Sequence, residues 1–497
     1  LIFSSNKMPS QDFVELPALS DSDYADIVHM DVVENNIDSA KIKVTVDNPY
    51  GEDVTEIVIS NLSTHIDSQT FADGKSTVMI TVSNPSTYES RYMVSSITTT
   101  SSNGYKSTRK YQNNELFLKL ELFRKIYTVE DFMTIKNMTS QNFMIMNDLD
   151  FSGYSNYYVT TFSGVLDGAG HTLKNIRVTT TSYSGLMTNM NGTVKNLNIE
   201  NFYKSSKTSY HGLFGTSNSN GKFSNVHIKN SVIEVTETMN TDTMRIGALV
   251  GQANQSIISY CSASNVNFTT ISEASNLVVG GLVGRSSGAF ISNSFVQDID
   301  ISIENSMSTL GVGGLVGQES SSSVGSIDTS YATGRIVTNG ANVGGIVGNG
   351  LGYVRNSYST VDIVSDMSFV GGIAGSARAS TDTVERSLYL GNIYSGSVDI
   401  YLNRIVGNYE SHESNYAMST NLVNGQLSTN ANGEKLLDYK DYLNPETYQM
   451  IFDTEAFDYS KSGDGILPKL YSQDGETLLP NQNDNYLYVN MFNIQRL

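Results

Sequence analysis

The sequence predicts a mainly β protein whose central part is a parallel β-helix, a solenoid of stacked coils. The main observation is a five-residue phrase that recurs as Gly280-Gly-Leu-Val-Gly284, Gly313-Gly-Leu-Val-Gly317, Gly344-Gly-Ile-Val-Gly348 and Gly371-Gly-Ile-Ala-Gly375. With three weaker copies, the closing glycines fall at 215, 251, 284, 317, 348, 375 and 407, which gives steps of 36, 33, 33, 31, 27 and 32 residues. A period of 20 to 50 residues is typical of repeat architectures, which present extended surfaces.

The second observation is a short β-prone run about ten residues after each phrase. Examples are Phe223–Ile228, Phe290–Val296 and Val354–Val361, which are rich in Val, Ile, Phe, Tyr and Ser. Residues 160 to 420 show no sustained helical period. Each repeat is therefore expected to supply short strands joined by turns.

Stacked coils place equivalent residues above one another, about 4.8 Å apart. We expect one interior row made of Leu213, Leu249, Leu282, Leu315, Ile346, Ile373 and Ile405. A second row is expected from Tyr260, Phe295, Tyr331, Tyr358, Tyr389 and Tyr416. The glycines permit tight corners where a side chain would meet the next coil. Whether Val283 points inward like Leu282 stays open, because neighbouring strand residues face opposite ways.

Length and composition bound the class of protein. A chain of 497 residues is too long for one compact core, so two or more domains are expected. The net charge of -19 and the lack of a basic stripe exclude a nucleic-acid binder, and no apolar stretch is long enough to span a bilayer. No signal peptide is visible, and the start at Leu1 suggests a piece of a longer protein. The lone Cys261 is expected to be a small buried strand residue.

Four segments follow along the chain. Residues 1–40 are acidic and weakly patterned, which indicates a linker or lead-in. Residues 41–124 alternate strands with Asn-Pro stops and predict a small β-sandwich-like domain. Residues 125–420 are expected to form the solenoid, and this segment begins with a short helix that has the capping box Thr128–Asp131. Residues 421–497 form a C-terminal cap or tail with a short helix that begins at Asn444-Pro445.

Candidate binding and catalytic residues are few. Tyr154, Tyr157, Tyr158 and Tyr183 could form an exposed recognition patch, and ordinary strand-face packing is the alternative. Asp167 and His171 could form an acid/base pair of a carbohydrate-active β-helix enzyme, and the alternative is a tight turn in which Asp167 accepts backbone N–H bonds. An EF-hand at Asp148 fails, because Val159 stands where the twelfth loop position needs Glu. The six histidines show no metal-ligand spacing.

Residues 126 to 472 resemble bacterial surface proteins with GLUG repeats. The matching motifs are Asn147–Gly153, Phe162–Leu173, the Gly-Gly-Leu-Val-Gly series and the exit Phe457–Ser460 with Leu467–Leu470. The overall layout resembles the N-terminal, non-catalytic regions of immunoglobulin A1 protease-like zinc metalloproteases of Gram-positive bacteria. The zinc motif His-Glu-x-x-His of that family is missing, since the nearest phrase is His412-Glu-Ser-Asn-Tyr416. No catalytic, cofactor or metal residue carries over, and zinc is expected only in a downstream protease domain.

Three functions remain open at this stage. The first is a non-catalytic solenoid module of a secreted or cell-surface bacterial zinc metalloendopeptidase, which positions the protease domain or binds a host glycoprotein such as an immunoglobulin. The second is a stand-alone adhesin or structural surface protein with no protease domain after Leu497. The third is a carbohydrate-active β-helix enzyme with an acidic cluster near Asp167. The resemblance implies an extracellular or cell-surface location and a role in adhesion or virulence.

Overall fold

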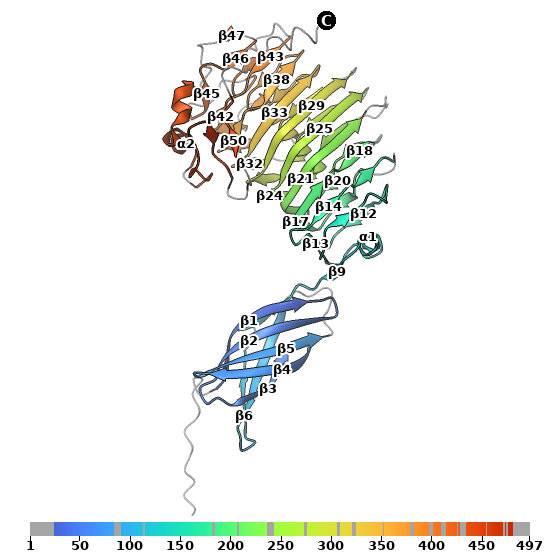
Figure 1. The fold of residues 1–497 in the computed structure, drawn as a ribbon, viewed down its shortest axis with the longest axis vertical. Helices are drawn as coiled ribbons and strands as arrows, with labels where there is room; N and C mark the ends of the chain where they lie inside the picture. The colour runs from blue at the N-terminus through green and yellow to red at the C-terminus, as the bar shows by residue number, and fades with distance from the viewer. Residues whose placement is uncertain are drawn as a thin grey trace, which may run out of the picture. The chain divides into compact units, whose positions relative to one another are not determined.

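The computed structural model describes residues 24–83, 91–112, 115–180, 184–205, 208–235, 243–272, 276–305, 309–320, 325–350, 352–377, 382–396, 401–408, 414–424, 426–427, 434–453, 455–470, 473 and 476–480. The chain is mainly β, with parallel sheets, as predicted (Figure 1). It divides into two compact units, Leu1–Arg124 and Lys125–Leu497. The Asn84-Pro85 stop, Tyr183 and His412 lie outside the described residues.

The first unit contains two antiparallel sheets that share one hydrophobic cluster. One sheet has the order β1-β2-β5-β4, and in the other β6 pairs with β3, β7 and β8. The strands are β1 (Asp26–Asn35), β2 (Ser39–Asp47), β3 (Asp53–Ile59), β4 (Ser63–Ala72), β5 (Lys75–Ser83), β6 (Arg91–Thr100), β7 (Lys106–Lys110) and β8 (Phe117–Lys119). Alternation positions the core, because β2 buries Ile42, Val44 and Val46 while the residues between them face outward.

Strand β1 corrects the expectation of a lead-in over residues 1–40. Asp26–Asn35 pairs antiparallel with β2 along its whole length, from Asp26 opposite Asp47 to Asn35 opposite Ala40. Most of its side chains are exposed, so the strand lacks the apolar alternation that reveals a half-buried strand in a sequence. The backbone pairing and the bond from Ile27 N to the Tyr111 hydroxyl (2.8 Å) hold it in place.

The second unit opens with β9 (Arg124–Ile126), the short helix α1 (Val129–Met133) and the 3-10 turn η2 (Thr134–Asn137). The predicted capping box is present, since Thr128 and Asp131 bond reciprocally to each other's backbone N–H groups. Val129, Phe132 and Ile135 are buried in the core of this unit.

Three sets of parallel strands follow, which we call the large sheet, the second sheet and the third sheet. In each, a strand pairs with the strand one repeat later. The second sheet has eight strands: β12 (Val159–Phe162), β16 (Met187–Met190), β20 (Phe214–Ser217), β23 (Val250–Asn254), β27 (Val283–Ser287), β31 (Val316–Glu319), β35 (Val347–Asn349) and β40 (Ala374–Ser376). The third has seven: β19 (Tyr210–His211), β22 (Met244–Gly247), β26 (Leu277–Gly280), β30 (Thr309–Gly313), β34 (Val343–Gly344), β39 (Val370–Gly371) and β44 (Leu402–Asn403).

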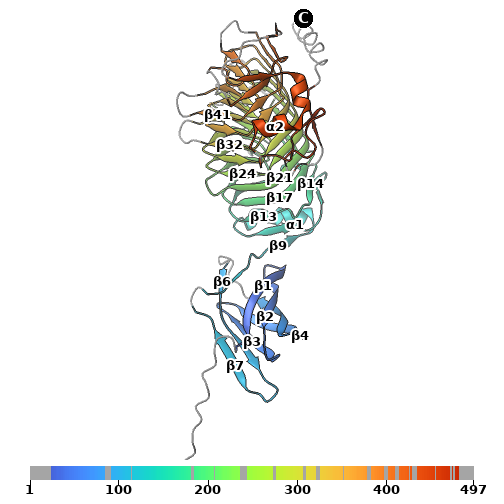
Figure 2. The same cartoon turned by 90° about the vertical axis from the view of Figure 1, so that its left-hand side faces the viewer.

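The large sheet holds the remaining strands, several of which lie one above another in Figure 2. They are β10 (Phe143–Ile145), β11 (Leu149–Asp150), β13 (Val165–Asp167), β14 (Thr172–Lys174), β15 (Arg177–Val178), β17 (Thr193–Glu200), β18 (Tyr203–Ser205), β21 (Lys222–Val235), β24 (Ile257–Ser259), β25 (Ser262–Ser272), β28 (Phe290–Ser292), β29 (Phe295–Asn305), β32 (Ser326–Asp328), β33 (Tyr331–Thr338), β36 (Tyr353–Arg355), β37 (Tyr358–Ser359), β38 (Asp362–Ser365), β41 (Thr383–Glu385), β42 (Leu388–Tyr389), β43 (Ile393–Ser395), β45 (Tyr416–Met418), β46 (Leu422–Val423), β47 (Gln426–Leu427) and β48 (Lys435–Leu437).

The recurring phrase joins the third sheet to the second. Leu282 lies in the turn between β26 and β27, and its backbone N–H donates to Leu315 O one repeat later (3.0 Å). The predicted interior row is confirmed, since all seven of its Leu and Ile side chains are buried. Val283 is also fully buried, because Leu282 belongs to the turn and strict strand alternation does not apply there.

The second predicted row is right only in its central part. Phe295, Tyr331 and Tyr358 are in register and stack with ring centroids 4.9 and 4.8 Å apart; we call these three residues the aromatic row. Tyr416 also lies in this register, where Leu388 precedes it. Tyr260 and Tyr389 do not belong to the row: Tyr260 occupies a turn, and Tyr389 is one position further along its strand and joins the interior core. A one-residue offset moves a side chain to the opposite face of a sheet.

The C-terminal segment covers the aromatic row. It contains η3 (Tyr439–Leu443), α2 (Pro445–Ile451) and the paired strands β49 (Ile466–Leu467) and β50 (Thr477–Leu478). The predicted helix start is confirmed, because Asn444 accepts a bond from Glu446 N and Pro445 takes the first position. Tyr358 is fully buried under this segment and donates its hydroxyl proton to Pro468 O (2.9 Å). In the described part of the chain, no helix is long and apolar enough to cross a membrane.

Lys204 is a lysine in an otherwise apolar interior row. It is 0% exposed and lies in register between Val178 and Ile233. Burial lowers the pKa of Lys204 from 10.5 to about 7. Between about pH 7 and 10.5 the unfolded chain holds a proton that the folded chain lacks, so the free energy of unfolding rises with pH in that window.

We therefore expect Lys204→Met to stabilise the protein at pH 7 and to remove about 1.4 kcal/mol per pH unit from the slope of stability between about pH 7 and 9. Urea unfolding of both proteins across that range measures this slope. Equal slopes in the two proteins would contradict a neutral buried amine. Lys229→Met is the control, because Lys229 is exposed on the large sheet.

Candidate functional site

A row of left-handed turn residues follows the large sheet from coil to coil. Positive φ angles of 47 to 57° occur at Asn196, Asn225, Tyr260, Asn293, Thr329, Asn356 and Arg386. Asparagine suits this conformation because its short side chain bonds locally. Tyrosine, threonine and arginine do not, and each costs roughly 1–2 kcal/mol there. Backbone strain of this kind clusters at functional sites, which directs attention to Thr329 and Arg386.

Buried serines beneath these turns hold three consecutive coils together. Ser330, Ser357 and Ser387 are 0% exposed, and each donates its hydroxyl proton to the carbonyl two residues earlier (2.8–3.0 Å). The N–H of Ser330 donates to the Ser357 hydroxyl of the next coil (3.3 Å). Cys261 occupies the same position two repeats before Ser330, and burial raises the pKa of its thiol to about 12. The expected burial is confirmed, but Cys261 lies between β24 and β25 and not within a strand.

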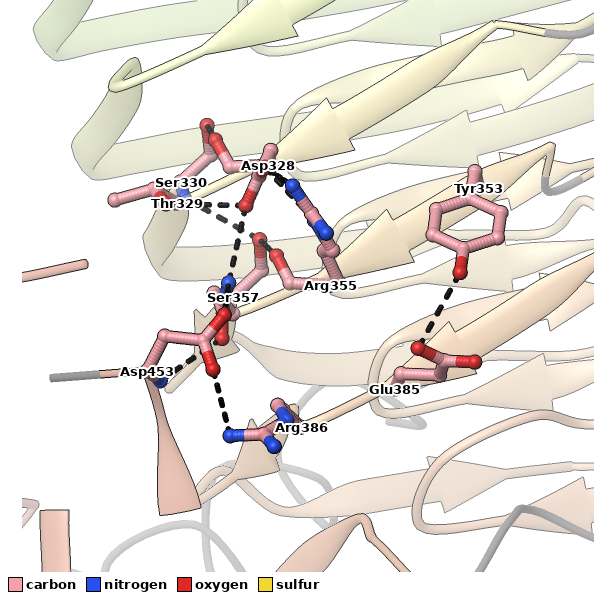
Figure 3. Close-up of polar contacts among 10 residues, drawn as sticks. Asp328, Thr329, Ser330, Tyr353, Arg355, Ser357, Glu385, Arg386 and Asp453 are labelled. Carbon is pink, nitrogen blue, oxygen red and sulfur yellow. Dashed lines mark hydrogen bonds and ion pairs between the residues drawn. The ribbon is translucent and has the colours of Figure 1, made fainter. Parts of the chain in front are cut away.

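Charged side chains stand at the outer edge of these turns (Figure 3). Arg355 donates from Nε (2.8 Å) and Nη2 (2.7 Å) to Oδ2 of Asp328, one coil earlier. Arg386 pairs with Asp453 of the C-terminal segment (2.7 Å). The Asn356 amide links the two pairs, because it donates to Asp328 Oδ1 (3.3 Å) and to Asp453 Oδ2 (2.9 Å).

These residues line an open groove of about 480 Å³ between the turns and the end of α2. We call it the turn groove; its lining is Asp328, Thr329, Arg355, Asn356, Arg386, Gln449, Phe452, Asp453, Glu455 and Ala456. The side chains of Arg355 and Arg386 are 48% and 50% exposed, so a ligand can reach both. Hydrogen bonding to Asp328 raises the pKa of Arg355, which keeps this guanidinium charged.

The chemistry of the turn groove is recognition of polar groups. Guanidinium, carboxylate and amide groups hold one another in fixed positions, and about half of each arginine faces solvent. Among the described residues, no group of three His, Cys, Asp or Glu side chains could hold a metal ion. The Thr329 hydroxyl donates to Asp328 Oδ1 (3.1 Å), and Arg355 binds the other oxygen of that carboxylate.

The predicted tyrosine patch lies near α1. Tyr157 donates to Phe132 O (3.1 Å), and its ring packs edge-on against Phe132 with centroids 5.7 Å apart. The Tyr154 hydroxyl bonds to Glu130, and Tyr158 is partly buried. The packing alternative accounts for the contacts of Tyr154 and Tyr157, whereas a binding role for the patch stays a prediction. Tyr183 lies outside the described residues.

Asp167 and His171 have different partners. Asp167 accepts the N–H of Ala169 (2.9 Å) and pairs with Lys195 (3.4 Å), as the tight-turn alternative predicts. His171 lies 3.4 Å from Asp148 instead. Asp150 accepts bonds from Asn175 and Ser152, which lower its pKa to about 2.

The turn groove is not evident in the sequence. Its residues come from three repeats and from a segment about 100 positions later, so no local motif marks them. One signal was available: Tyr260, Thr329 and Arg386 interrupt a series in which asparagine is the common residue, and the last two of them line the groove.

Asp453→Ala removes an acceptor from both Arg386 and Asn356. The pair is half-exposed, so we expect a loss of only about 1 kcal/mol in stability, with faster amide hydrogen exchange in α2. Hydrogen exchange with mass spectrometry measures this. Glu455→Ala is the matched control, because Glu455 lines the same groove. Equal exchange in α2 of both variants would show that the Asp453 contacts do not hold the segment.

The comparisons with known proteins place few constraints on function. No family model matches the sequence, and no curated protein matches it. Among solved structures, the chain is similar to one described as "a putative immunoglobulin A1 protease from Bacteroides ovatus". The two share 20% identity over 55% of this chain and 84% of that one, with a TM-score of 0.39.

Proposed function

We propose that this chain is a non-catalytic binding module of a secreted or cell-surface bacterial zinc metalloendopeptidase of the immunoglobulin A1 protease type. In this proposal residues 125–420 form a parallel β-helix of GLUG-type repeats, and the module holds a host glycoprotein for a protease domain that carries the zinc. The sequence resemblance motivates the choice of protease, and the repeat-by-repeat pairing of the parallel strands supports the β-helix.

The turn groove is the observation that carries the binding role. Three consecutive coils and the C-terminal segment bring two half-exposed guanidinium groups into one open groove. The left-handed turn at Arg386 places one of these guanidinium groups in the groove at a cost in backbone energy. Amide and guanidinium donors with carboxylate acceptors suit the hydroxyl and amide groups of a glycoprotein.

The third sequence-based function, a glycan-cleaving enzyme, has less support. Glycoside hydrolysis needs two carboxyl groups that flank one bond, one of them protonated. Asp167 instead bonds to a backbone N–H and to Lys195, and Asp328 is held by Arg355. The adhesin alternative predicts the same binding, and a protease domain encoded after Leu497 separates it from the proposal.

Binding of the full chain to immunoglobulin A1, by biolayer interferometry, tests the proposal. We expect saturable binding that Arg386→Ala weakens at least tenfold through loss of a charged donor in the groove. Arg177→Ala is the matched control, since Arg177 is an exposed arginine on another part of the large sheet. Absence of binding to immunoglobulin A1 and to other host glycoproteins would contradict the proposal. Equal weakening by both variants would show that the turn groove is not the binding site.

A further inference from the structure

Two arginines lie together where the second and third sheets meet. Arg285 projects from β27, in register between Gln252 of β23 and Gln318 of β31. Arg245 projects from β22, in register after Tyr210 of β19. The guanidinium of Arg245 lies over the Tyr210 ring, 5.1 Å from its centroid.

Glycine brings the two strands into contact. A Cβ at Gly284 would lie 2.6 Å from the backbone N of Ile246, so β27 touches β22 at this point. The neighbours of these two residues are Arg285 and Arg245, and the charge of Arg285 lowers the pKa of Arg245 beyond the larger effect of burial. Two repeats later, a hydrogen bond from Asn349 Nδ2 of β35 to Leu310 O of β30 (2.7 Å) joins the corresponding two strands. At Arg245 and Arg285, which we call the arginine pair, two like charges face each other instead.

Four buried polar atoms of the arginine pair and of the two neighbouring glutamines lack hydrogen-bond partners. The Nε atoms of both arginines and the Oε1 atoms of Gln252 and Gln318 are buried without a hydrogen bond in the described structure. Arg285 donates from Nη2 to the Ser320 hydroxyl (3.2 Å), and none of the ion pairs recorded among the described residues includes either arginine. A buried donor without an acceptor costs about 1–3 kcal/mol, and close like charges add to that cost. Two neighbouring cations without an ion-pair partner, in a protein of net charge -19, therefore form a favourable position for an anion.

We propose that the arginine pair binds the carboxylate of an acidic saccharide. The guanidinium forks of Arg245 and Arg285 supply donors to its two oxygens. The amide oxygens of Gln252 and Gln318 accept hydrogen bonds from the sugar hydroxyls beside it, whereas Gln252 Nε2 already donates to Asn254 Oδ1 (2.7 Å). The inference rests on the proposed function only for the source of the saccharide, the glycans of a host glycoprotein.

Titration of the full chain with sialyllactose, monitored by ligand-observed NMR and calorimetry, tests the site. We expect sialyllactose to bind and neutral lactose to bind at least tenfold more weakly. Arg245→Gln and Arg285→Gln should each weaken sialyllactose binding at least tenfold, with thermal midpoints equal to or above that of the native protein, because each relieves like-charge repulsion. Arg177→Gln is the control: Arg177 also lies over a tyrosine ring, that of Tyr203 at 4.3 Å, on a different sheet.

Three outcomes would overturn the site. These are equal binding of lactose and sialyllactose, equal loss of binding in Arg177→Gln, and binding of a glutamate-rich peptide in preference to sialyllactose. Sialidase treatment of immunoglobulin A1 separates this inference from the proposed function. Glycoprotein binding that persists after sialidase treatment and in a variant with both Arg245→Gln and Arg285→Gln would refute the saccharide site, and the proposed function would stand. Sialyllactose binding without glycoprotein binding would do the reverse.

Discussion

Replacing Gly344 with alanine is expected to destabilise the second unit by about 3 kcal/mol, the upper part of the usual range for overpacking. A Cβ at this position would overlap the carbonyl oxygen of Val347 and lie 2.7 Å from the backbone N of Gly375 in the next coil. Both obstacles are backbone atoms in hydrogen-bonded strands, so the neighbours cannot yield without disturbing two coils. Urea unfolding of the full chain measures the loss.

Gly153→Ala is the matched control for this substitution. A Cβ at Gly153 meets nothing within 4 Å, so we expect a change within about 0.5 kcal/mol. Hydrogen exchange should show the Gly344→Ala effect in β30, β34 and β39. Equal stability of the two variants would mean that the glycine phrase does not serve close backbone packing.

Tyr358→Ala is expected to cost about 4 kcal/mol, because it removes a fully buried ring. The ring stacks on Tyr331 at 4.8 Å and lies 5.6 Å from Phe457 of the C-terminal segment. Tyr358→Phe keeps the ring and loses only the hydrogen bond to Pro468 O, so about 1 kcal/mol is expected from that change.

The loss should be local as well as global. We expect hydrogen exchange to rise most in α2 and between residues 455 and 470 in Tyr358→Ala, because Tyr358 packs directly against that segment. Tyr353→Ala removes a partly buried tyrosine of the same coil and serves as the control. Unchanged protection of α2 in Tyr358→Ala would show that the aromatic row does not hold the segment.

The sequence allowed good prediction where one physical cause repeats. The glycine phrase identified the interior row from Leu213 to Ile405, because each copy places the same residue in the same turn. The capping box at Thr128 and the helix start at Asn444 were also predictable, since both depend on residues three positions apart or fewer.

Prediction failed where the position of a side chain depends on strand register or on contacts with a segment distant in the sequence. Tyr389 looked like the successor of Tyr358, yet Leu388 takes that place, and a shift of one residue sends the ring inward. Strand β1 escaped detection because its pairing is through the backbone while most of its side chains face solvent. The turn groove depends on Asp453, which meets Arg386 only after the C-terminal segment folds back.

The most direct test of a non-catalytic binding module is mass analysis of the purified full chain mixed with immunoglobulin A1. The proposal predicts a complex with the summed mass of both partners, in which the immunoglobulin heavy chain stays intact after long incubation with zinc. Cleavage of the heavy chain by this chain alone, or its complete failure to form a complex, would contradict the account.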